Sequence, residues 1–181
     1  MGRQVLEAQH HNGKKLTETI VKGAISGGVG VIALDQVANY LYTHESKEAL
    51  EKEKQVRAEI GASEMGPVSI GVRKMTRVLQ LDLNEKQLDA VATVIHYSLG
   101  VLPGAAFAVL LDRAPKTGAG KGTLYGLALF VLNDELLSVK LGWAAKPNRY
   151  PWQAHIRGLL AHVALGVATY QTFRLLNRIW K

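Results

Sequence analysis

Four ionisable side chains stand inside long apolar stretches of this 181-residue chain. Two are aspartates, Asp35 and Asp134, and two are histidines, His96 and His162. Ionisable groups are costly in an apolar environment, and inside a membrane they mark functional sites by default. Carboxylates and imidazoles can hold and release protons, and both can ligate cations. These four residues, with Glu135 beside Asp134, are therefore the first candidates for chemistry.

The apolar stretches around these residues are each long enough for the ~20 residues that a helix needs to cross a bilayer core. They cover residues 21–42, 88–111, 122–142 and 155–176. Backbone groups must be hydrogen-bonded within a spanning segment, so we predict helices. The expected fold class is all-α, an integral membrane four-helix bundle in a single domain over residues 1–181. The alternative is a soluble all-α protein that buries the same four helices.

Composition excludes several functional classes. The chain has no cysteine, so it has no disulfide framework, no thiolate nucleophile and no zinc–thiolate site. The formal charge is +7, but the charges cluster in a few short stretches and leave the long stretches between them almost uncharged. We therefore predict the lipid bilayer as a partner and no nucleic acid. No phosphate-loop or Ser/His/Asp pattern is present, so an enzyme is not the favoured class.

The spacing around the ionisable residues repeats along the chain. Lysine, glycine and aspartate recur 99 residues apart in the first and third stretches, as Lys22, Gly23, Gly27 and Asp35, and as Lys121, Gly122, Gly126 and Asp134. Histidine, leucine and glycine recur 66 residues apart in the second and fourth, as His96, Leu99 and Gly100, and as His162, Leu165 and Gly166. We interpret this as a duplicated two-helix hairpin with a pseudo-twofold axis along the membrane normal. Because glycine and leucine are common in spans, coincidence is the alternative.

Helix geometry places the ionisable residues at one depth. At 1.5 Å per residue, each aspartate lies roughly 18 Å beyond the first glycine of its motif. In a core about 30 Å thick, this leaves about 12 Å to the outer face. His96 lies about eight residues inside the outer start of its stretch, also roughly 12 Å deep, and His162 reaches a similar level. We predict an intramembrane polar layer shielded inside the bundle, formed by Asp35, His96, Asp134, Glu135 and His162.

Further residues complete the predicted site. Asn133 flanks Asp134, and His155 and Arg157 lie nearer the outer surface, where we expect the Arg157 side chain to snorkel. Small residues let membrane helices approach closely. We expect the following glycines at helix contacts: Gly23, Gly27, Gly100, Gly104, Gly122, Gly126, Gly158 and Gly166.

Three roles for the layer stay open at this stage. It could bind or relay protons, a small cation or a small solute, or its Asp–His contacts could only clamp the bundle. It could also hold a metal, since two imidazoles and two carboxylates suit zinc, iron or manganese, with Asp35, His96, Asp134 and His162 as candidate ligands. No tight ligand spacing such as H-E-x-x-H is present. A haem between the two histidines is a variant of the metal hypothesis, and the cofactor is unknown.

A polar connector, residues 43–87, separates the first two stretches. Residues 45–60 are rich in charge and predict an exposed helix. Residues 68–81 predict an amphipathic helix that either lies on the membrane surface or is a solvated connector. The alternative function follows from this segment: a non-catalytic membrane accessory or partner-binding module whose 43–87 segment carries the interaction. The glycine-rich helix faces also permit a homo-oligomer.

Aromatic and basic residues indicate how the chain is oriented. Tyrosines and tryptophans crowd one set of span ends, as in an interfacial belt. Four crossings place both termini on one side, and the lysines and arginines near the short connections favour the cytoplasm for that side.

An ordered set of short motifs in the second half resembles a known family. The set includes Ile95-His96-Tyr97, Gly122-Thr-Leu-Tyr125-Gly126, Asn133-Asp134-Glu135, Tyr150-Pro151 and Arg157-Gly158. It resembles the YagU-like family of small bacterial inner-membrane proteins over roughly residues 70–175. The chain departs from the family at Asn133, where members often carry an aromatic residue, and in the charged 45–60 segment, where they often carry a proline-rich stretch. The resemblance implies a multi-pass protein of the bacterial inner membrane and brings no established reaction.

Overall fold

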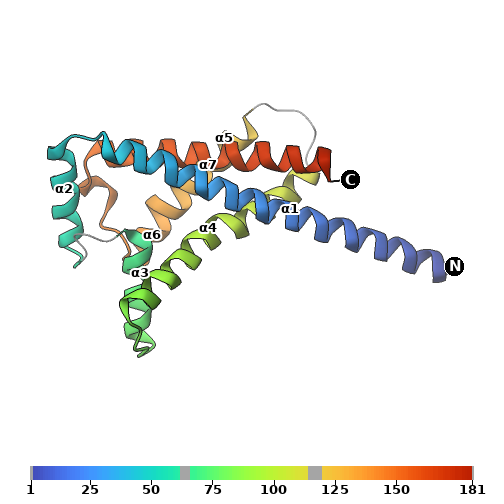
Figure 1. Cartoon of the computed structure of the whole chain (residues 1–181), viewed down its shortest axis with the longest axis horizontal. Helices are drawn as coiled ribbons and strands as arrows, with labels where there is room; N and C mark the ends of the chain where they lie inside the picture. The colour runs from blue at the N-terminus through green and yellow to red at the C-terminus, as the bar shows by residue number, and fades with distance from the viewer. Residues whose placement is uncertain (1, 62–65, 114–119, 181) are drawn as a thin grey trace.

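The structure is a computed structural model that describes residues 2–61, 66–113 and 120–180, with side chains described except at residues 2–12 and 14. Within these ranges the chain is all-helical and has no strand, which confirms the predicted all-α class (Figure 1). Three long helices are α1 (Gly2–Thr43), α4 (Glu85–Arg113) and α7 (Trp152–Ile179). The third predicted span is one continuous rod of three parts, α5 (Lys121–Leu129), a π-helix η1 (Phe130–Leu137) and α6 (Ser138–Lys140).

Three of these segments are long and apolar enough to cross a membrane, among the residues that the structure describes. They are Lys15–Thr43, Glu85–Arg113 and Lys121–Lys140. The fourth predicted span, residues 155–176, lies within α7, which is long enough but is not one of the three. A physical reason is that α7 carries polar groups of the site described below, including His155, Arg157 and His162. The four-helix membrane bundle therefore stays a prediction.

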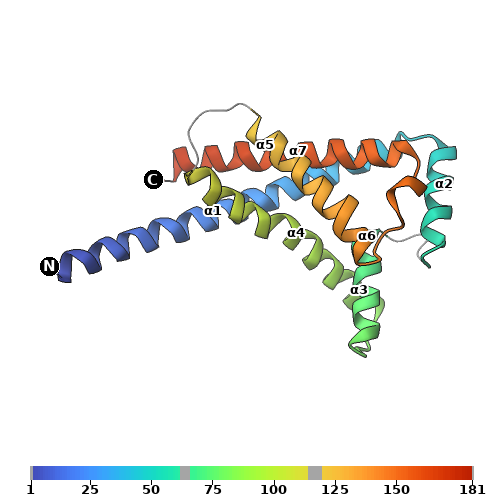
Figure 2. The same cartoon turned by 180° about the vertical axis from the view of Figure 1, so that it is seen from behind.

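The long helices pack in the order α4, α1, α7, α5, and α1 lies against both α4 and α7 (Figures 1 and 2). Glycines permit the closest approaches. A methyl group at Gly104 would lie 2.7 Å from the Cα of Gly27, so α1 and α4 touch through their backbones. A methyl group at Gly166 would lie 2.8 Å from the Cα of Gly126, so α5 and α7 do the same. Gly27 and Gly126 correspond in the predicted repeat, but their partners do not, because Gly166 corresponds to Gly100 rather than to Gly104.

Two short helices of the polar connector, residues 43–87, cover one end of the bundle. Helix α3 (Pro67–Val78) docks through Gly71, where a methyl group would lie 2.5 Å from Cδ2 of Trp143. The amine of Lys74 donates to the carbonyl of Gly142, which fixes the same contact. Buried Val72 packs against Leu88 of α4. The amphipathic helix expected over residues 68–81 is therefore formed over Pro67–Val78. Ile70 and Val72 are buried against the protein, whereas Met75 and Val78 are exposed.

Helix α2 (Lys47–Ala58) differs from the expected exposed helix. Three residues on one of its faces are buried, Ala49, Glu53 and Val56, with Glu53 only 3% exposed. Ser46 caps its first turn by accepting from the Ala49 N–H. Figure 1 shows α2 crossing the end of α1 and α7. Segment 45–60 is therefore part of the packed structure, and only its other face is exposed.

The opposite end of the bundle is held by Lys22. This lysine is buried, pairs with Glu18 at 2.5 Å and donates to the carbonyl of Trp180 at 2.7 Å. Its amine also lies 5.6 Å from the centre of the Trp180 ring. The contact joins the middle of α1 to the carboxyl end of α7, at the end of the bundle opposite α2 and α3.

Candidate functional site

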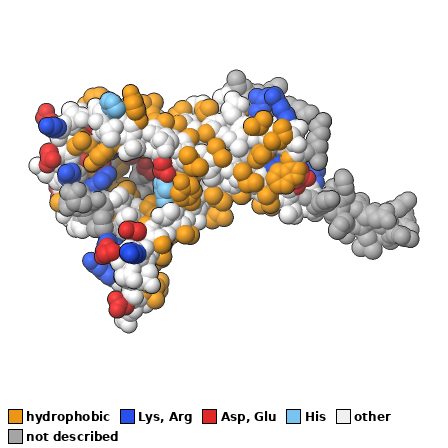
Figure 3. Space-filling model, viewed as in Figure 1, with side chains coloured by type: hydrophobic (Ala, Val, Ile, Leu, Met, Phe, Trp, Pro, Cys, Tyr) orange, Lys and Arg blue, Asp and Glu red, His pale blue; other side chains and the backbone are white. Residues whose placement is uncertain are grey.

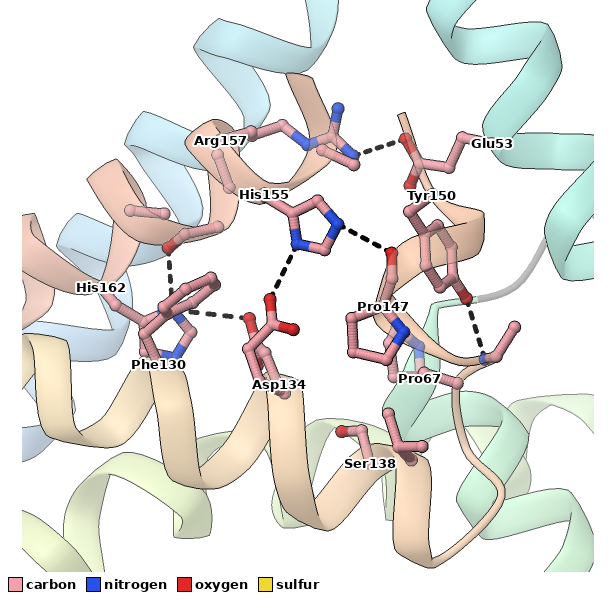
Figure 4. Close-up of a pocket in the computed structure, with 18 of the residues that line it drawn as sticks. Glu53, Pro67, Phe130, Asp134, Ser138, Pro147, Tyr150, His155, Arg157 and His162 are labelled. Atoms are coloured by element: carbon pink, nitrogen blue, oxygen red, sulfur yellow. Dashed lines mark hydrogen bonds and ion pairs between the residues drawn. The ribbon is translucent and has the colours of Figure 1, made fainter. Parts of the chain in front are cut away.

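Two cavities flank the π-helix η1. The first, of about 280 Å³, is enclosed by η1, α7, α2 and the turn at residues 144–150 (Figure 4). The second, of about 250 Å³, lies toward α3 and α4. Both are lined by Asp134 and His162, which therefore stand between them. Figure 3 shows a hollow between the helices with acidic and histidine side chains at its edge.

The π-helix decides which acidic side chains face the first cavity. In η1 the chain is wound more widely than in an α-helix, and the N–H of Ser138 reaches the carbonyl of Asn133, five residues back. The Ser138 hydroxyl donates to the same carbonyl at 2.7 Å. An α-helix would point consecutive residues about 100° apart. Here Asp134 and Glu135 both line the first cavity, while Asn133 lines the second.

Asp134 is poorly satisfied where it stands. Its Oδ2 lies 3.6 Å from Nδ1 of His162, which is beyond a good hydrogen bond. That imidazole instead places Nδ1 3.0 Å from the carbonyl of Gly158, and a carbonyl can only accept, so Nδ1 donates its proton there. His162 is 9% exposed, whereas 43% of the Asp134 side chain is accessible. The carboxylate therefore offers its oxygens to the cavities.

His155 and Glu135 hold a proton between them. Nε2 of His155 lies 2.9 Å from the carbonyl of Pro147, so it must carry a hydrogen. Nδ1 of the same ring lies 2.8 Å from Oε1 of Glu135. This second contact also needs a proton, either on the imidazole or on the carboxyl group. The pair therefore stores one exchangeable proton at the wall of the first cavity (Figure 4).

Asp35 and His96 form a third carboxylate–imidazole pair. Oδ1 of Asp35 on α1 lies 2.8 Å from Nε2 of His96 on α4, and both side chains are part-buried. His96 lines the second cavity together with Asp134. The predicted layer is thus assembled around this cavity: His96, Asp134 and His162 line it, and Asp35 is joined to it through His96.

Arg157 does not extend toward the surface as expected but is held in a buried ionic cluster. Its guanidinium pairs with Glu45 and, at 2.6 Å, with Glu53, and its side chain is only 11% exposed. Glu53 also pairs with Arg57, and the Arg157 guanidinium lies 5.2 Å from the centre of the Tyr42 ring. The correction has a simple cause: α2 folds over the end of α7 and supplies two carboxylates, so Arg157 need not reach water.

Several site residues were not predicted from the sequence. Glu53 and Arg57 line the first cavity from α2, and Phe130 and Tyr150 supply aromatic walls. A signal for Glu53 exists, because it stands at helical spacing between Ala49 and Val56, in the middle of an otherwise apolar stripe. The aromatic residues carry no comparable signal.

The metal hypothesis gains no geometric support. Across the described ranges, no group of three or more His, Asp or Glu side chains is placed to hold one ion. The candidate ligands instead form separate pairs, Asp35 with His96 and Asp134 with His162. Pairs of this kind can carry protons without a metal.

No protein-family model, no curated protein and no solved structure matches the chain. The functional argument therefore rests on the residues and their geometry.

Proposed function

We propose that this chain is a multi-pass protein of the bacterial inner membrane, related to the YagU-like family, with α7 as a fourth span and both termini in the cytoplasm. Three helices of suitable length and apolarity support the membrane assignment. The duplicated hairpin is part of the proposal. It is supported by the corresponding glycines Gly27 and Gly126, which closely approach α4 and α7 respectively, and by the corresponding pairs Asp35–His96 and Asp134–His162.

The function that we propose is the handling of protons, a small cation or a small solute through the Asp/His layer. The observation that carries it is the position of Asp134, whose carboxylate borders two cavities and lies 3.6 Å from Nδ1 of His162, beyond a good hydrogen bond. Ionisable groups are rare in membrane spans, and they usually face a water-filled cavity on an ion or proton pathway. In addition, 43% of the Asp134 side chain is accessible.

Each neighbouring group has a role in this mechanism. The His96–Asp35 pair can pass a proton to or from the second cavity, and the His155–Glu135 pair can do so at the first. Imidazoles titrate near neutral pH, so they exchange protons with both carboxylates and water. Asp134, reached from both cavities, is the common acceptor. Proton movement then needs only water in the cavities and small rotations of these side chains.

Replacing Asp134 with asparagine is expected to abolish protein-dependent proton flux, because the amide keeps the shape but cannot take up a proton. The measurement uses the purified chain in liposomes that contain a pH-sensitive dye, with an imposed pH gradient. Flux through the D134N variant should fall to the rate of empty liposomes, and Asp35→Asn should slow it. The matched control is Asp112→Asn, an exposed aspartate at the far end of α4. Parental flux in D134N would refute the proposal.

A further inference from the structure

The first cavity carries one uncompensated negative charge. The cavity is lined by two arginines, Arg57 and Arg157, which pair with two carboxylates, Glu53 and Glu45. These four charges cancel. Glu135 shares a proton with His155. His162 donates its Nδ1 proton in a hydrogen bond to the carbonyl of Gly158. In the described part of the chain, the charge left facing the cavity is therefore that of Asp134.

An aromatic ring stands beside this carboxylate. Phe130 lies one turn before Asp134 in η1, and both line the cavity. Gly158 on α7 faces the two together. A methyl group there would lie 2.9 Å from Cε2 of Phe130 and 3.3 Å from Oδ2 of Asp134. The absence of a side chain at position 158 leaves ring and carboxylate side by side, as Figure 4 shows.

The rest of the wall is mostly apolar. Tyr150 adds a second ring, and its hydroxyl is already engaged because it accepts from the Ala145 N–H at 3.2 Å. Alanines and prolines supply much of the remaining surface, including Ala154, Ala161 and Pro147. One negative charge beside an aromatic ring, a second ring elsewhere in the wall and apolar surroundings are the features that recognise ammonium groups with apolar substituents.

We infer that the first cavity binds a small monovalent organic cation, an alkylated ammonium, with its charge at Asp134 and its alkyl groups against Phe130 and Tyr150. The inference rests on the proposed function, and names the class of solute that the same site takes. A divalent metal ion would need several oxygen ligands, which the described residues do not bring together. An anion would find both arginines of the cavity already paired. The volume of about 280 Å³ suits a molecule smaller than a drug-sized ligand.

The test uses choline as the probe and its neutral isostere, 3,3-dimethyl-1-butanol, as the matched control ligand. Isothermal titration of the purified full-length chain in detergent should show saturable binding of choline and none of the alcohol. Asp134→Asn should weaken choline binding at least tenfold. Phe130→Leu should weaken it about tenfold, as expected for a desolvated cation–π contact of about 1.4 kcal/mol, and Phe130→Tyr should retain it. The exposed-site variant Asp112→Asn should bind like the parent.

The outcomes separate this inference from the proposed function. Equal binding of choline and the alcohol, or choline binding that Asp134→Asn leaves unchanged, would overturn the inference. If proton flux depends on Asp134 but choline does not bind, the inference about the ammonium site is wrong and the proposed function stands. If the protein shows neither Asp134-dependent proton flux nor choline binding, the inference and the proposed function are both wrong. Thermal unfolding of each variant shows whether it is folded. If Phe130→Leu does not fold, the Phe130→Tyr variant still tests the role of the ring.

Discussion

Replacing Arg157 with alanine is expected to lower the free energy of unfolding by about 3–5 kcal/mol, the usual cost of breaking a buried ion pair on one side. The change removes the shared partner of Glu45 and Glu53, whose side chains are only 7% and 4% exposed. One oxygen of Glu45 already has no hydrogen-bond partner, so this carboxylate would be left without compensation. The measurement is the midpoint of denaturant-induced unfolding in detergent.

The matched control is Arg149→Ala. Arg149 pairs with Glu59 at 2.6 Å, but the two side chains are 55% and 46% exposed. Exposed pairs of this kind contribute about 0–1 kcal/mol, so this variant should unfold close to the parent. Changing Glu45 and Glu53 to glutamine in the R157A background should recover part of the loss, because the buried charges are then removed together. Equal effects of R157A and R149A would show that the cluster contributes no more than a surface pair.

A methyl group at Gly27 is expected to destabilise the protein by about 1–3 kcal/mol through overpacking. It would overlap the carbonyl oxygen of Gly100 and lie 3.0 Å from the Cα of Val101, so the backbone of α4 itself must move. Because α1 packs between α4 and α7, this movement cannot be taken up by one side chain. The measurement is the thermal unfolding temperature of Gly27→Ala in detergent.

Gly28→Ala is the control at the next position. Its methyl group would meet only Cγ2 of Val101 at 3.8 Å, an ordinary contact. Both variants gain helix propensity, up to about 1 kcal/mol, so the difference between them isolates the clash. G28A should be as stable as the parent or more so. If G27A and G28A unfold at the same temperature, α1 and α4 do not approach each other as closely as described.

The sequence was sufficient to predict the helices. Apolar runs of membrane length fixed the positions of α1, α4, the α5–α6 rod and α7, and the charged connector was expected to form two helices. The amino end of α1 was not expected to be helical, since residues 1–19 are polar and no apolar periodicity marks them. The burial of α2 was also missed, because its partner Arg157 lies 104 residues beyond Glu53. Long-range pairing of this kind leaves little trace in local composition.

The candidate site could be predicted in part. Depth along the helices predicted one layer for His96, Asp134 and His162, and all three line the second cavity. Direction around a helix was less accessible. In an α-helix, consecutive residues such as Asp134 and Glu135 would point about 100° apart, whereas the chain forms a π-helix there. That winding depends on contacts with other elements, which no periodicity in one segment can reveal.

The wide winding of residues 130–137 has a consequence for the two halves of the molecule. In the proposed repeat Asp35 corresponds to Asp134, but the stretch of α1 around Asp35 is an unbroken α-helix, so the backbone paths of the two stretches differ. A return of this stretch to α-helical winding would turn the residues before it relative to those after it, and would carry the acidic pair away from its present hollow. The direction of Asp134 and Glu135 toward the cavity therefore depends on the π-helical winding of η1, whereas the direction of Asp35 depends on a regular α-helix.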